Sequence, residues 1–489
     1  MSSSPFSALN RRDFLTLAGG AALLAPSARL ISAEAGASST RPTSNGTTAP
    51  FVPAGGSGSL GYQPVITPNG ATLPWKLVDG VKVFHLVAEP VTHEFAPGLV
   101  AECWGYNGRV HGPTLEAVEG DRVRIYVTNR LTAPTTIHWH GVLLPSGMDG
   151  VAGVSQKSIA PGETFKYEFT LRQHGTLMYH SHHDEMTQMQ LGMMGLFVIH
   201  PKNPTQPPPA RDYALLLSEW KIEVGARRPD PNEMTDFNVF TMNARCFPGT
   251  QALVARRGER VRIRLGNLSS MSHHSIHLHG YQFKIVATDG GEIPESGQWP
   301  AITVHVPTGS TRTIEFTANE PGDWVMHCHM LHHGMTQMGH GAGNLVGVDF
   351  SGLREKIRPL VPGFMPMGAT GMGEMGTMGM ANPANSLPMI ATPGQHDAIT
   401  MGGMFTILKV RDELPADGSE PGWYSSPPGT LASPAAEEEL KRDGVALAAA
   451  AAQASARTGV AVELCDPSQT AGQAAAKPQP TARVKLSPG

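Results

Sequence analysis

The 489-residue sequence has few cysteines, few charged residues and no long hydrophobic run, and each absence excludes a class of protein. Four cysteines are too few for a disulfide scaffold in a chain of this length. No apolar stretch reaches the ~18–20 residues of a membrane-spanning helix. Charged residues make up only 16% of the chain and the formal net charge is −4, so composition offers no basic surface for nucleic acid.

The abundant residues are glycine (55), proline (41), methionine (23) and histidine (21). Glycine and proline at this level predict many turns and some low-complexity sequence, so the folded part is smaller than the whole chain. Histidine imidazoles and methionine thioethers are metal ligands. The positions of these two residue types therefore guide the search for function.

The N-terminus has the features of an export signal. Arg11 and Arg12 precede a short apolar stretch, and a small-residue cleavage site follows at Ala33–Ala35. The arginine pair resembles a twin-arginine signal, and an ordinary Sec signal that carries two arginines is the alternative. Residues 1–35 are therefore predicted to be a signal peptide, with export to the periplasm or beyond, and residues 36–60 a flexible linker.

From residue 61 onward, short runs of valine, isoleucine, phenylalanine and threonine alternate with glycine and proline, which predicts an all-β fold. Four motifs recur in the same order at offsets of 138 to 147 residues, for example Glu119–Ile125 with Arg257–Ile263. The sequence therefore predicts two tandem Greek-key β-sandwiches, at residues 61–205 and 206–350.

Beyond residue 350 the sequence predicts less order. Residues 351–412 contain a methionine segment (residues 365–404, nine methionines) and a possible closing strand at Gly403–Val410. Residues 413–489 are predicted to be a low-complexity, partly disordered extension, with one alanine-rich helix at Glu437–Ala454.

Histidines gather in four clusters, two in each repeat: around His138 and His180 in the first, and around His274 and His327 in the second. Each cluster contains an H-x-H pair, and a strand directs alternate side chains to one face, so both imidazoles can share a metal. The fourth pair encloses Cys328 and is followed by His333 and Met338. Two imidazoles, one thiolate and a weak methionine ligand form the blue-copper set.

On these motifs the sequence resembles the multicopper oxidases of cupredoxin fold, which include laccases, bilirubin oxidase and cuprous oxidases. The resemblance covers residues 75–350 and implies four copper ions per chain: one type 1, one type 2 and a type 3 pair. It assigns His274, Cys328, His333 and the axial Met338 to type 1 copper, and His138 and His277 to type 2 copper. The type 3 ligands would be His140, His180, His182, His279, His327 and His329.

The resemblance implies electron transfer from type 1 copper, through Cys328 and the flanking His327 and His329, to a trinuclear cluster that reduces O2 to water. Only 91 residues separate His182 from His274, too few for an intervening sandwich, so the chain resembles the two-domain branch of the family. Ser181 replaces the cysteine in the first repeat, so only the second repeat is expected to hold type 1 copper. In that branch the ligands of neighbouring chains meet, which implies a homotrimer.

Weaker candidates surround these ligands. Asp149 matches the family's carboxylate near type 2 copper, where it would orient water and pass protons, although a turn aspartate is the plain alternative. Asp184 and Glu185 are candidate proton-relay carboxylates, because Gly334 occupies the family's usual relay position. Packing is the expected role of Trp139 and Trp324, whereas His183, His273, His332 and His340 are expected to lie behind the ligands or to be exposed. Cys103 and Cys246 could form a disulfide or remain free thiols.

The substrate remains open between Cu(I) or another metal ion and phenolic compounds. The thioethers of the methionine segment favour Cu(I), which would make the protein a cuprous oxidase, although compositional drift could also produce such a segment. A copper-binding resistance protein without turnover is the alternative from another class. A copper nitrite reductase is disfavoured, because its blue copper lies in the first domain, where this chain has Ser181.

Overall fold

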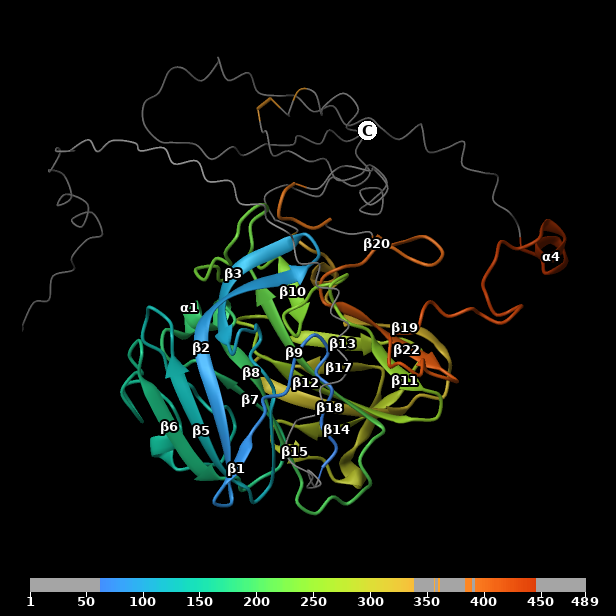
Figure 1. The fold of residues 1–489 in the computed structure, drawn as a ribbon. Coiled ribbons are helices and arrows are strands. Elements are labelled where there is room, and N and C mark those ends of the chain that lie inside the picture. Colours follow the sequence, from blue (N-terminus) through green and yellow to red (C-terminus); the bar gives the residue numbers. More distant parts are fainter. Residues whose placement is uncertain (1–61, 338–355, 357–358, 361–382, 389–391, 446–489) are drawn as a thin grey trace, which may run out of the picture. The chain divides into compact units, whose positions relative to one another are not determined.

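The computed structural model describes residues 62–337, 356, 359–360, 383–388 and 392–445 (Figure 1). Within these residues almost all regular structure is β-strand, which confirms the predicted all-β class. The predicted signal peptide, the linker, Met338, His340 and most of the methionine segment lie outside the described residues. No helix in the described part of the chain is long and apolar enough to cross a membrane.

The first repeat contains two sheets. One has the order β1-β2-β5-β6 with β3 paired to β2, and the other has the order β4-β8-β7. The strands are β1 (Lys76–Val78), β2 (Val81–Ala96), β3 (Leu99–Tyr106), β4 (Leu115–Val118), β5 (Arg122–Asn129), β6 (Thr164–Thr170), β7 (Gly175–His180) and β8 (Met194–His200). The 3-10 helix η1 (Ser146–Met148) and the short helix α1 (Glu185–Gln190) lie in the connections.

The second repeat also contains two sheets, with the orders β10-β9-β12-β18-β14-β15, where β16 pairs with β14, and β11-β22-β19-β13-β17. The first sheet consists of β9 (Arg211–Trp220), β10 (Val239–Met242), β12 (Arg260–Asn267), β14 (Phe283–Thr288), β15 (Gly291–Glu292), β16 (Trp299–Ala301) and β18 (Ser310–Thr317). The second consists of β11 (Leu253–Arg256), β13 (His274–Leu278), β17 (Thr303–Val306), β19 (Gly322–Cys328) and β22 (Phe405–Arg411). Two 3-10 helices, η2 (Glu295–Gly297) and η3 (Leu331–Gly334), connect these strands.

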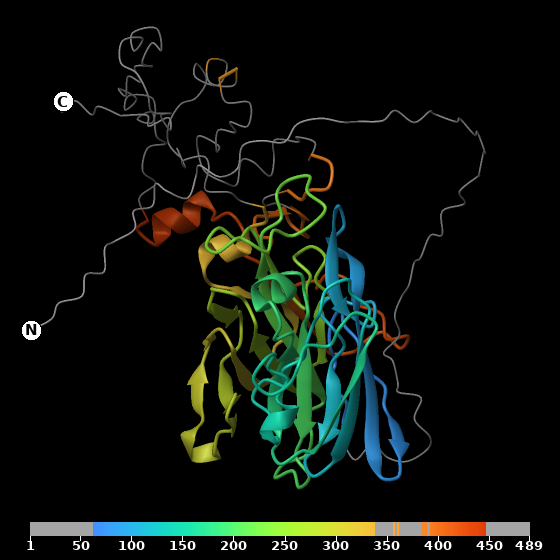
Figure 2. The same ribbon diagram turned by 90° about the vertical axis from the view of Figure 1, so that its left-hand side faces the viewer.

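The two repeats pair their last strands in the same way. In the first, β8 lies between β4, to which it is parallel, and β7, to which it is antiparallel. In the second, β22 has the same relation to β11 and β19. Figure 1 shows β22 in orange beside β19 and β11 of the second repeat, and Figure 2 shows the same fold turned by 90°. The second sandwich is therefore discontinuous in sequence, and residues 329–404 are an insertion where the first repeat has residues 181–193.

Alternating burial along the strands fixes which side chains face the core. In β13, His274, Ile276 and Leu278 are buried while Ser275 and His277 are partly exposed. The opposite strand β19 places Cys328 across from Ile276 and His327 across from His277. Because directly paired residues share a face, Cys328 belongs to the core side of this sheet and His327 to the outer side.

Contacts between the repeats are specific. The Arg264 guanidinium donates a hydrogen bond to Thr176 Oγ1 across 2.9 Å, and Thr311 Oγ1 donates to the Thr176 carbonyl across 2.9 Å. A separate hydrophobic cluster combines the β2–β3 hairpin of the first repeat with Trp220 and Val239 of the second. Cys103 and Cys246 are buried in this cluster as free thiols, so they do not form the disulfide that the sequence left open.

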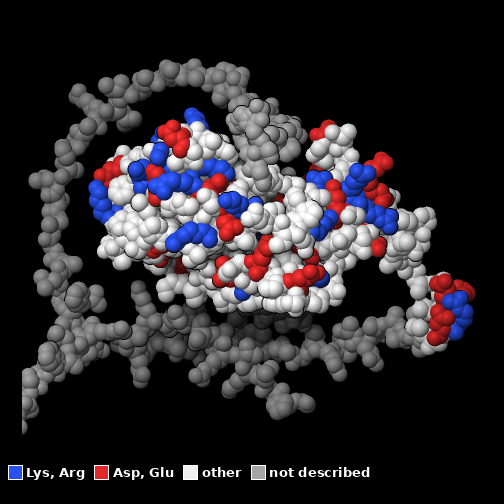
Figure 3. All heavy atoms as spheres, turned by 90° about the horizontal axis from the view of Figure 1, so that it is seen from below, with Lys and Arg blue, Asp and Glu red and all other residues white. Residues whose placement is uncertain are grey.

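Residues after β22 return to its outer side. Arg411 pairs with Asp323 and donates to the Gly422 carbonyl, and Tyr424 N–H donates to Asp323 Oδ2. Helix α4 (Glu437–Arg442) is shorter than the helix expected at Glu437–Ala454, and residues after 445 lie outside the described part. Two short strands, β20 (Thr392–Pro393) and β21 (Ala398–Ile399), pair upstream of β22. On the face seen in Figure 3, basic and acidic side chains are interspersed.

Candidate metal centres

Three potential ligand atoms meet at one end of the second sandwich. His274 Nδ1 lies 3.1 Å from His333 Nδ1, and Cys328 Sγ lies 3.7 Å from the first and 3.4 Å from the second of these nitrogens. His274 begins β13, Cys328 ends β19, and His333 belongs to η3. These are three of the four residues to which the sequence assigned type 1 copper, and the fourth, Met338, lies outside the described residues.

This group is buried, and burial sets its protonation. Desolvation lowers the pKa of His274 well below its usual range and lowers that of His333 to about 4, so both imidazoles are neutral at neutral pH. Burial also raises the pKa of the Cys328 thiol. A soft cation would favour the thiolate and accept both neutral imidazoles, so the donor set fits copper.

Neighbouring side chains hold the two imidazoles. His274 Nε2 donates to Ser269 Oγ across 2.7 Å, which leaves Nδ1 as the ligand atom. The Phe240 ring stacks on His333, with centroids 4.0 Å apart. Glu219 pairs with Phe240 across β9 and β10, and its Oε1 accepts the backbone N–H groups of residues 271 and 272.

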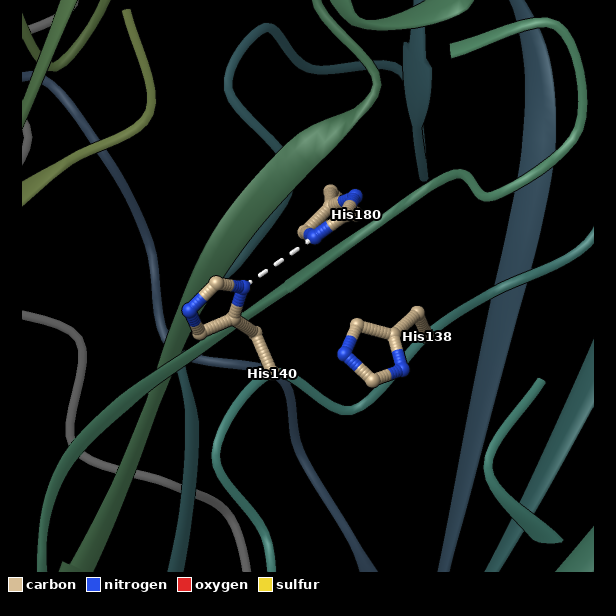
Figure 4. Close-up of side chains that lie close together, drawn as sticks. All are labelled: His138, His140 and His180. Carbon is tan, nitrogen blue, oxygen red and sulfur yellow. Dashed lines mark hydrogen bonds between the residues drawn. The ribbon is translucent and has the colours of Figure 1, made fainter. Parts of the chain in front are cut away.

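A second group lies in the first repeat. His138, His140 and His180 each offer one nitrogen, and these three atoms lie within 4.8 Å of one another. Figure 4 shows His140 Nδ1 directed at His180 Nε2 across 3.3 Å, with His138 beside them. The His182 ring lies 5.4 Å from that of His138 and 6.1 Å from that of His180. The structure thus brings together the four predicted first-repeat ligands.

Backbone carbonyls fix the orientation of these imidazoles. His138 Nδ1 donates to the Asp149 carbonyl, His180 Nδ1 to the Ser181 carbonyl, and His140 Nε2 to the Gly309 carbonyl. Each bond leaves the opposite ring nitrogen free for metal. Burial lowers the pKa of His180 to about 3 and also lowers that of His140, so both rings are neutral ligands at neutral pH.

A third group lies on the outer side of the β13–β19 pair. The rings of His277, His279, His327 and His329 lie 4.8 to 5.8 Å from their neighbours in the group. His277 Nδ1 donates to the Ile302 carbonyl, and His327 Nδ1 donates to the Cys328 carbonyl. His279 Nε2 and His327 Nε2 approach to 3.3 Å. These are the four predicted second-repeat ligands.

The first-repeat and second-repeat groups do not touch within the described chain: no hydrogen bond or ring contact joins them. Both groups reach the surface, because the His182 side chain is 32% exposed and His279 and His329 are exposed. Exposed apolar side chains flank both groups, Met186 near the first and Ile302 and Leu331 near the second.

Two predicted carboxylates lie next to ligands. Asp149 Oδ1 is 3.4 Å from His138 Nδ1, the nitrogen that also bonds the Asp149 carbonyl. The carboxylate therefore lies on the side of the ring away from Nε2, the nitrogen that is free for metal. Glu185 Oε1 is 3.3 Å from His182 Nε2 and 3.8 Å from His180 Nδ1. Asp184 is the N-cap residue of α1 and is exposed. Of the candidates Asp184 and Glu185, only Glu185 therefore contacts the histidines.

The neighbouring residues behave largely as expected. Trp139 is fully buried and Trp324 packs against the core of the second repeat. His183 bonds Ser158 Oγ. His273 Nδ1 accepts the Thr308 N–H, which leaves Nε2 protonated and unsuited to binding metal. The supporting residues Ser269, Phe240 and Glu219 are absent from the sequence prediction, because no spacing rule connects them to the ligands.

The described chain thus has two cupredoxin-like sandwiches and three groups of potential metal ligands, and comparison with known proteins shows which family has these features. Two family models, both described as multicopper oxidase, match residues 88–204 and 223–342. The chain belongs to the multicopper oxidase family, in a two-domain form.

Two relatives illustrate the likeness. The chain is 28% identical over 322 residues to a copper resistance protein A homolog of Pseudomonas syringae pv. tomato, which covers 56% of this chain and 52% of that protein. It is 26% identical to the blue copper oxidase of Nitrosomonas europaea, whose crystal structure aligns with a TM-score of 0.51 over 67% of this chain and 85% of that one. The chain thus spans about half the length of the curated relatives that it matches.

Proposed function

We propose that the protein is a multicopper oxidase with type 1 copper held by His274, Cys328 and His333. The observation that carries the proposal is the approach of His274 Nδ1, Cys328 Sγ and His333 Nδ1 to within 3.1 to 3.7 Å of one another. Met338, five residues beyond His333 in the sequence, would add a weak thioether ligand. The bound coppers would supply one-electron oxidation of a reductant and four-electron reduction of O2 to water.

The chain's own residues connect the two functions. Cys328 lies on the core side of β19, while its neighbours His327 and His329 belong to the outer group. This short backbone segment would join type 1 copper to the trinuclear cluster by covalent bonds. Backbone carbonyl groups orient five of the eight imidazoles that would bind the trinuclear cluster. The ligand geometry is therefore largely formed before any metal binds.

The trinuclear cluster would form between copies of the chain, in a homotrimer. One copy would supply His138, His140, His180 and His182, and its neighbour His277, His279, His327 and His329. The separation of the two groups within one chain and the exposed apolar side chains beside each support this arrangement. If a monomer identified by light scattering retained full O2 reduction, the shared cluster would be excluded.

The reductant that fits best is Cu(I) or another small metal ion. His274 is fully buried and His333 is 6% exposed, so a bulky phenol has little direct access to either imidazole. The insertion that contains the methionine segment also begins and ends at this site. Gly402 N–H donates to the Gly334 carbonyl, and Met404 N–H donates to the His333 carbonyl.

A third contact anchors this insertion. Asn385 exchanges two hydrogen bonds with the backbone of Val100, and Leu387 N–H donates to Gln337 Oε1, next to Met338 in the chain. In the sequence, the methionines at residues 365–380 lie between these anchored residues, which contact the region of the type 1 ligands. Soft thioethers on such a loop would raise the local concentration of Cu(I).

Steady-state O2 uptake with Cu(I), Mn(II), Fe(II) and a phenol tests the reaction and the substrate together. Turnover is expected with Cu(I), and a variant that lacks residues 365–380 should have a raised apparent KM for Cu(I) with unchanged phenol oxidation. Phenol turnover alone would instead indicate a laccase-like enzyme. Copper binding without any O2 uptake would indicate a binding protein. Export to the periplasm stays a prediction from residues 1–35.

A further inference from the structure

Asn267, the last residue of β12, is fully buried and connects two segments that lead to different histidine groups. Its Oδ1 accepts the Ser269 N–H across 2.9 Å. Its Nδ2 donates to the Ser272 carbonyl across 2.9 Å and to the Val306 carbonyl across 3.0 Å. Its backbone carbonyl accepts the Gly309 N–H across 2.9 Å. The side chain and the backbone carbonyl of Asn267 therefore hold the loop of residues 268–273 and the turn of residues 307–310 in fixed positions relative to each other.

The loop, residues 268–273, presents His274. Ser269, which Asn267 fixes through its N–H, accepts the Nε2 proton of His274. Ser272, which Asn267 fixes through its carbonyl, lies two residues before His274. A displacement of this loop would therefore move the His274 ring and its hydrogen-bond partner together.

The turn, residues 307–310, holds a histidine of the other repeat. The Gly309 carbonyl accepts the Nε2 proton of His140 across 2.8 Å, which directs Nδ1 of that ring towards His180. Gly309 has a φ of +72°, a left-handed conformation that favours glycine. Thr308 also joins turn to loop, because its Oγ1 donates to the Ser272 carbonyl.

We infer that Asn267 is a positioning residue for both copper sites of its chain. Through Ser269 and Ser272 it sets the orientation of His274 at type 1 copper, and through Val306 and Gly309 it sets that of His140 in the trinuclear ligand set. This inference rests on the proposed function. It predicts that a single polar side chain, which touches no ligand, couples the geometry of the two sites.

The first repeat contains a matched residue. Asn129 ends β5, its Oδ1 accepts the Leu131 N–H, and its Nδ2 donates to the Ala133 and Ile159 carbonyls. Its carbonyl accepts the Gly162 N–H, as that of Asn267 accepts the Gly309 N–H. No hydrogen bond in the described chain joins the Gly162 carbonyl to a histidine. Asn129 therefore has the same structural role without a type 1 loop.

The test compares copper-loaded Asn267→Ala with copper-loaded Asn129→Ala and wild type. Three signals are measured: the midpoint potential, the visible thiolate-to-copper absorption, and the near-ultraviolet absorption of the oxidised copper pair. Both substitutions should lower the melting temperature to a similar extent, since each removes three side-chain hydrogen bonds. Only Asn267→Ala should shift the potential and weaken both the visible and the near-ultraviolet bands, with copper binding weakened up to ~10-fold.

Equal shifts in both variants, or no shift in either, would overturn the inference. If Asn267→Ala does not fold, Asn267→Ser and Asn129→Ser repeat the comparison, because serine keeps a hydroxyl that can bond one loop group. The proposed function is judged separately on wild type. If the wild-type protein gives neither the visible band nor O2 uptake, the oxidase proposal fails, whereas normal wild-type signals with unresponsive variants reject only the role of Asn267.

Discussion

The same position in the two repeats is filled in two different ways. In the second repeat it holds His274, Cys328 and His333, whose potential ligand atoms converge. In the first repeat the equivalent strand positions carry Thr135 and Ser181, and α1 supplies Gln188. These three side chains are also buried, but they bond one another: Thr135 Oγ1 donates to Gln188 Oε1 across 2.7 Å, and Ser181 Oγ donates to the same oxygen.

The same sandwich scaffold can therefore have or lack a cluster of potential metal ligands at this position. Buried polar groups need partners, and a cation satisfies three ligand atoms that cannot all bond one another. Where histidines and cysteine are absent, Gln188 supplies the missing connection and also donates Nε2 to the Pro134 carbonyl. The first repeat therefore closes the same gap with neutral hydrogen bonds, and its connection to the last strand stays short.

The largest expected effect comes from replacing Cys328 of the second repeat with serine, the residue that the first repeat has at the equivalent position 181. Cys328→Ser removes the thiolate, which no hydroxyl replaces as a ligand for blue copper. We expect loss of the visible absorption and of O2 uptake, with about one copper fewer per chain. Absorption spectroscopy and metal analysis measure both results.

Ser181→Ala is the control for Cys328→Ser, since it changes the equivalent residue in the repeat for which no type 1 copper is proposed. It should keep the visible band at wild-type intensity. A Cys328→Ser protein that stays blue would mean that the thiolate ligand lies elsewhere.

Both repeats bury a neutral imidazole, and low pH tests this shared property. Burial lowers the pKa of His180 in the first repeat to about 3 and that of His333 in the second to about 4. Below pH ~6.5 the unfolded chain takes up protons on these residues and the folded chain does not. The free energy of unfolding therefore decreases as the pH decreases. Each group contributes up to about 3 kcal/mol of this loss. Melting temperatures of the copper-free protein should therefore decline between pH ~6.5 and ~4.

The copper-loaded protein sharpens this prediction. Protons and copper compete for the same nitrogens, so the extra stability that copper provides should itself shrink over this pH range. A copper-free melting temperature that stayed constant from pH 7 to 4 would contradict the buried, neutral state of these imidazoles.

Sequence reasoning reached the histidines and the cysteine that the structure brings together, because their spacing carries the information. An H-x-H pair on a strand faces one side, and the order of motifs in each repeat shows which pairs belong together. The fold class followed from strand-like patterning. The position of β22 within the second sandwich could only be suggested, because residues 329–404 separate it from β19. Nothing local identifies the partner of a strand across such an insertion.

The supporting residues could not be predicted, since they act through contacts between distant segments. Glu219 reaches a loop more than fifty residues away, and the carbonyl that orients His140 belongs to Gly309 in the other repeat. One signal was available: Asn129 and Asn267 each stand four residues after the matched motifs Glu119–Ile125 and Arg257–Ile263, at the same offset of 138 residues. A repeated buried asparagine indicates a shared structural role, but only the structure reveals which groups it joins.

A third prediction addresses the hydrogen-bonded group of the first repeat. Gln188→Ala removes the acceptor of both hydroxyls and leaves Thr135, Ser181 and the Pro134 carbonyl with fewer partners in a buried position. Lost hydrogen bonds and the cavity should cost about 2–4 kcal/mol of unfolding free energy. Urea denaturation measures this cost, and exposed Gln63→Ala is the control that should change stability by less than about 0.5 kcal/mol.

The smallest expected effect comes from changing the first repeat towards the second. Ser181→Cys supplies the sulfur but not the imidazoles, because Thr135 and Gln188 stand where His274 and His333 stand in the other repeat. We expect no second blue copper and a loss of about 1 kcal/mol, because a thiol donates a weaker hydrogen bond to Gln188 Oε1 than a hydroxyl does. Copper analysis, together with the visible spectrum of Ser181→Cys, gives the result. An additional equivalent of copper with doubled visible absorption would show that the cysteine alone decides which repeat carries type 1 copper, and the contrast drawn between the two groups would then fail.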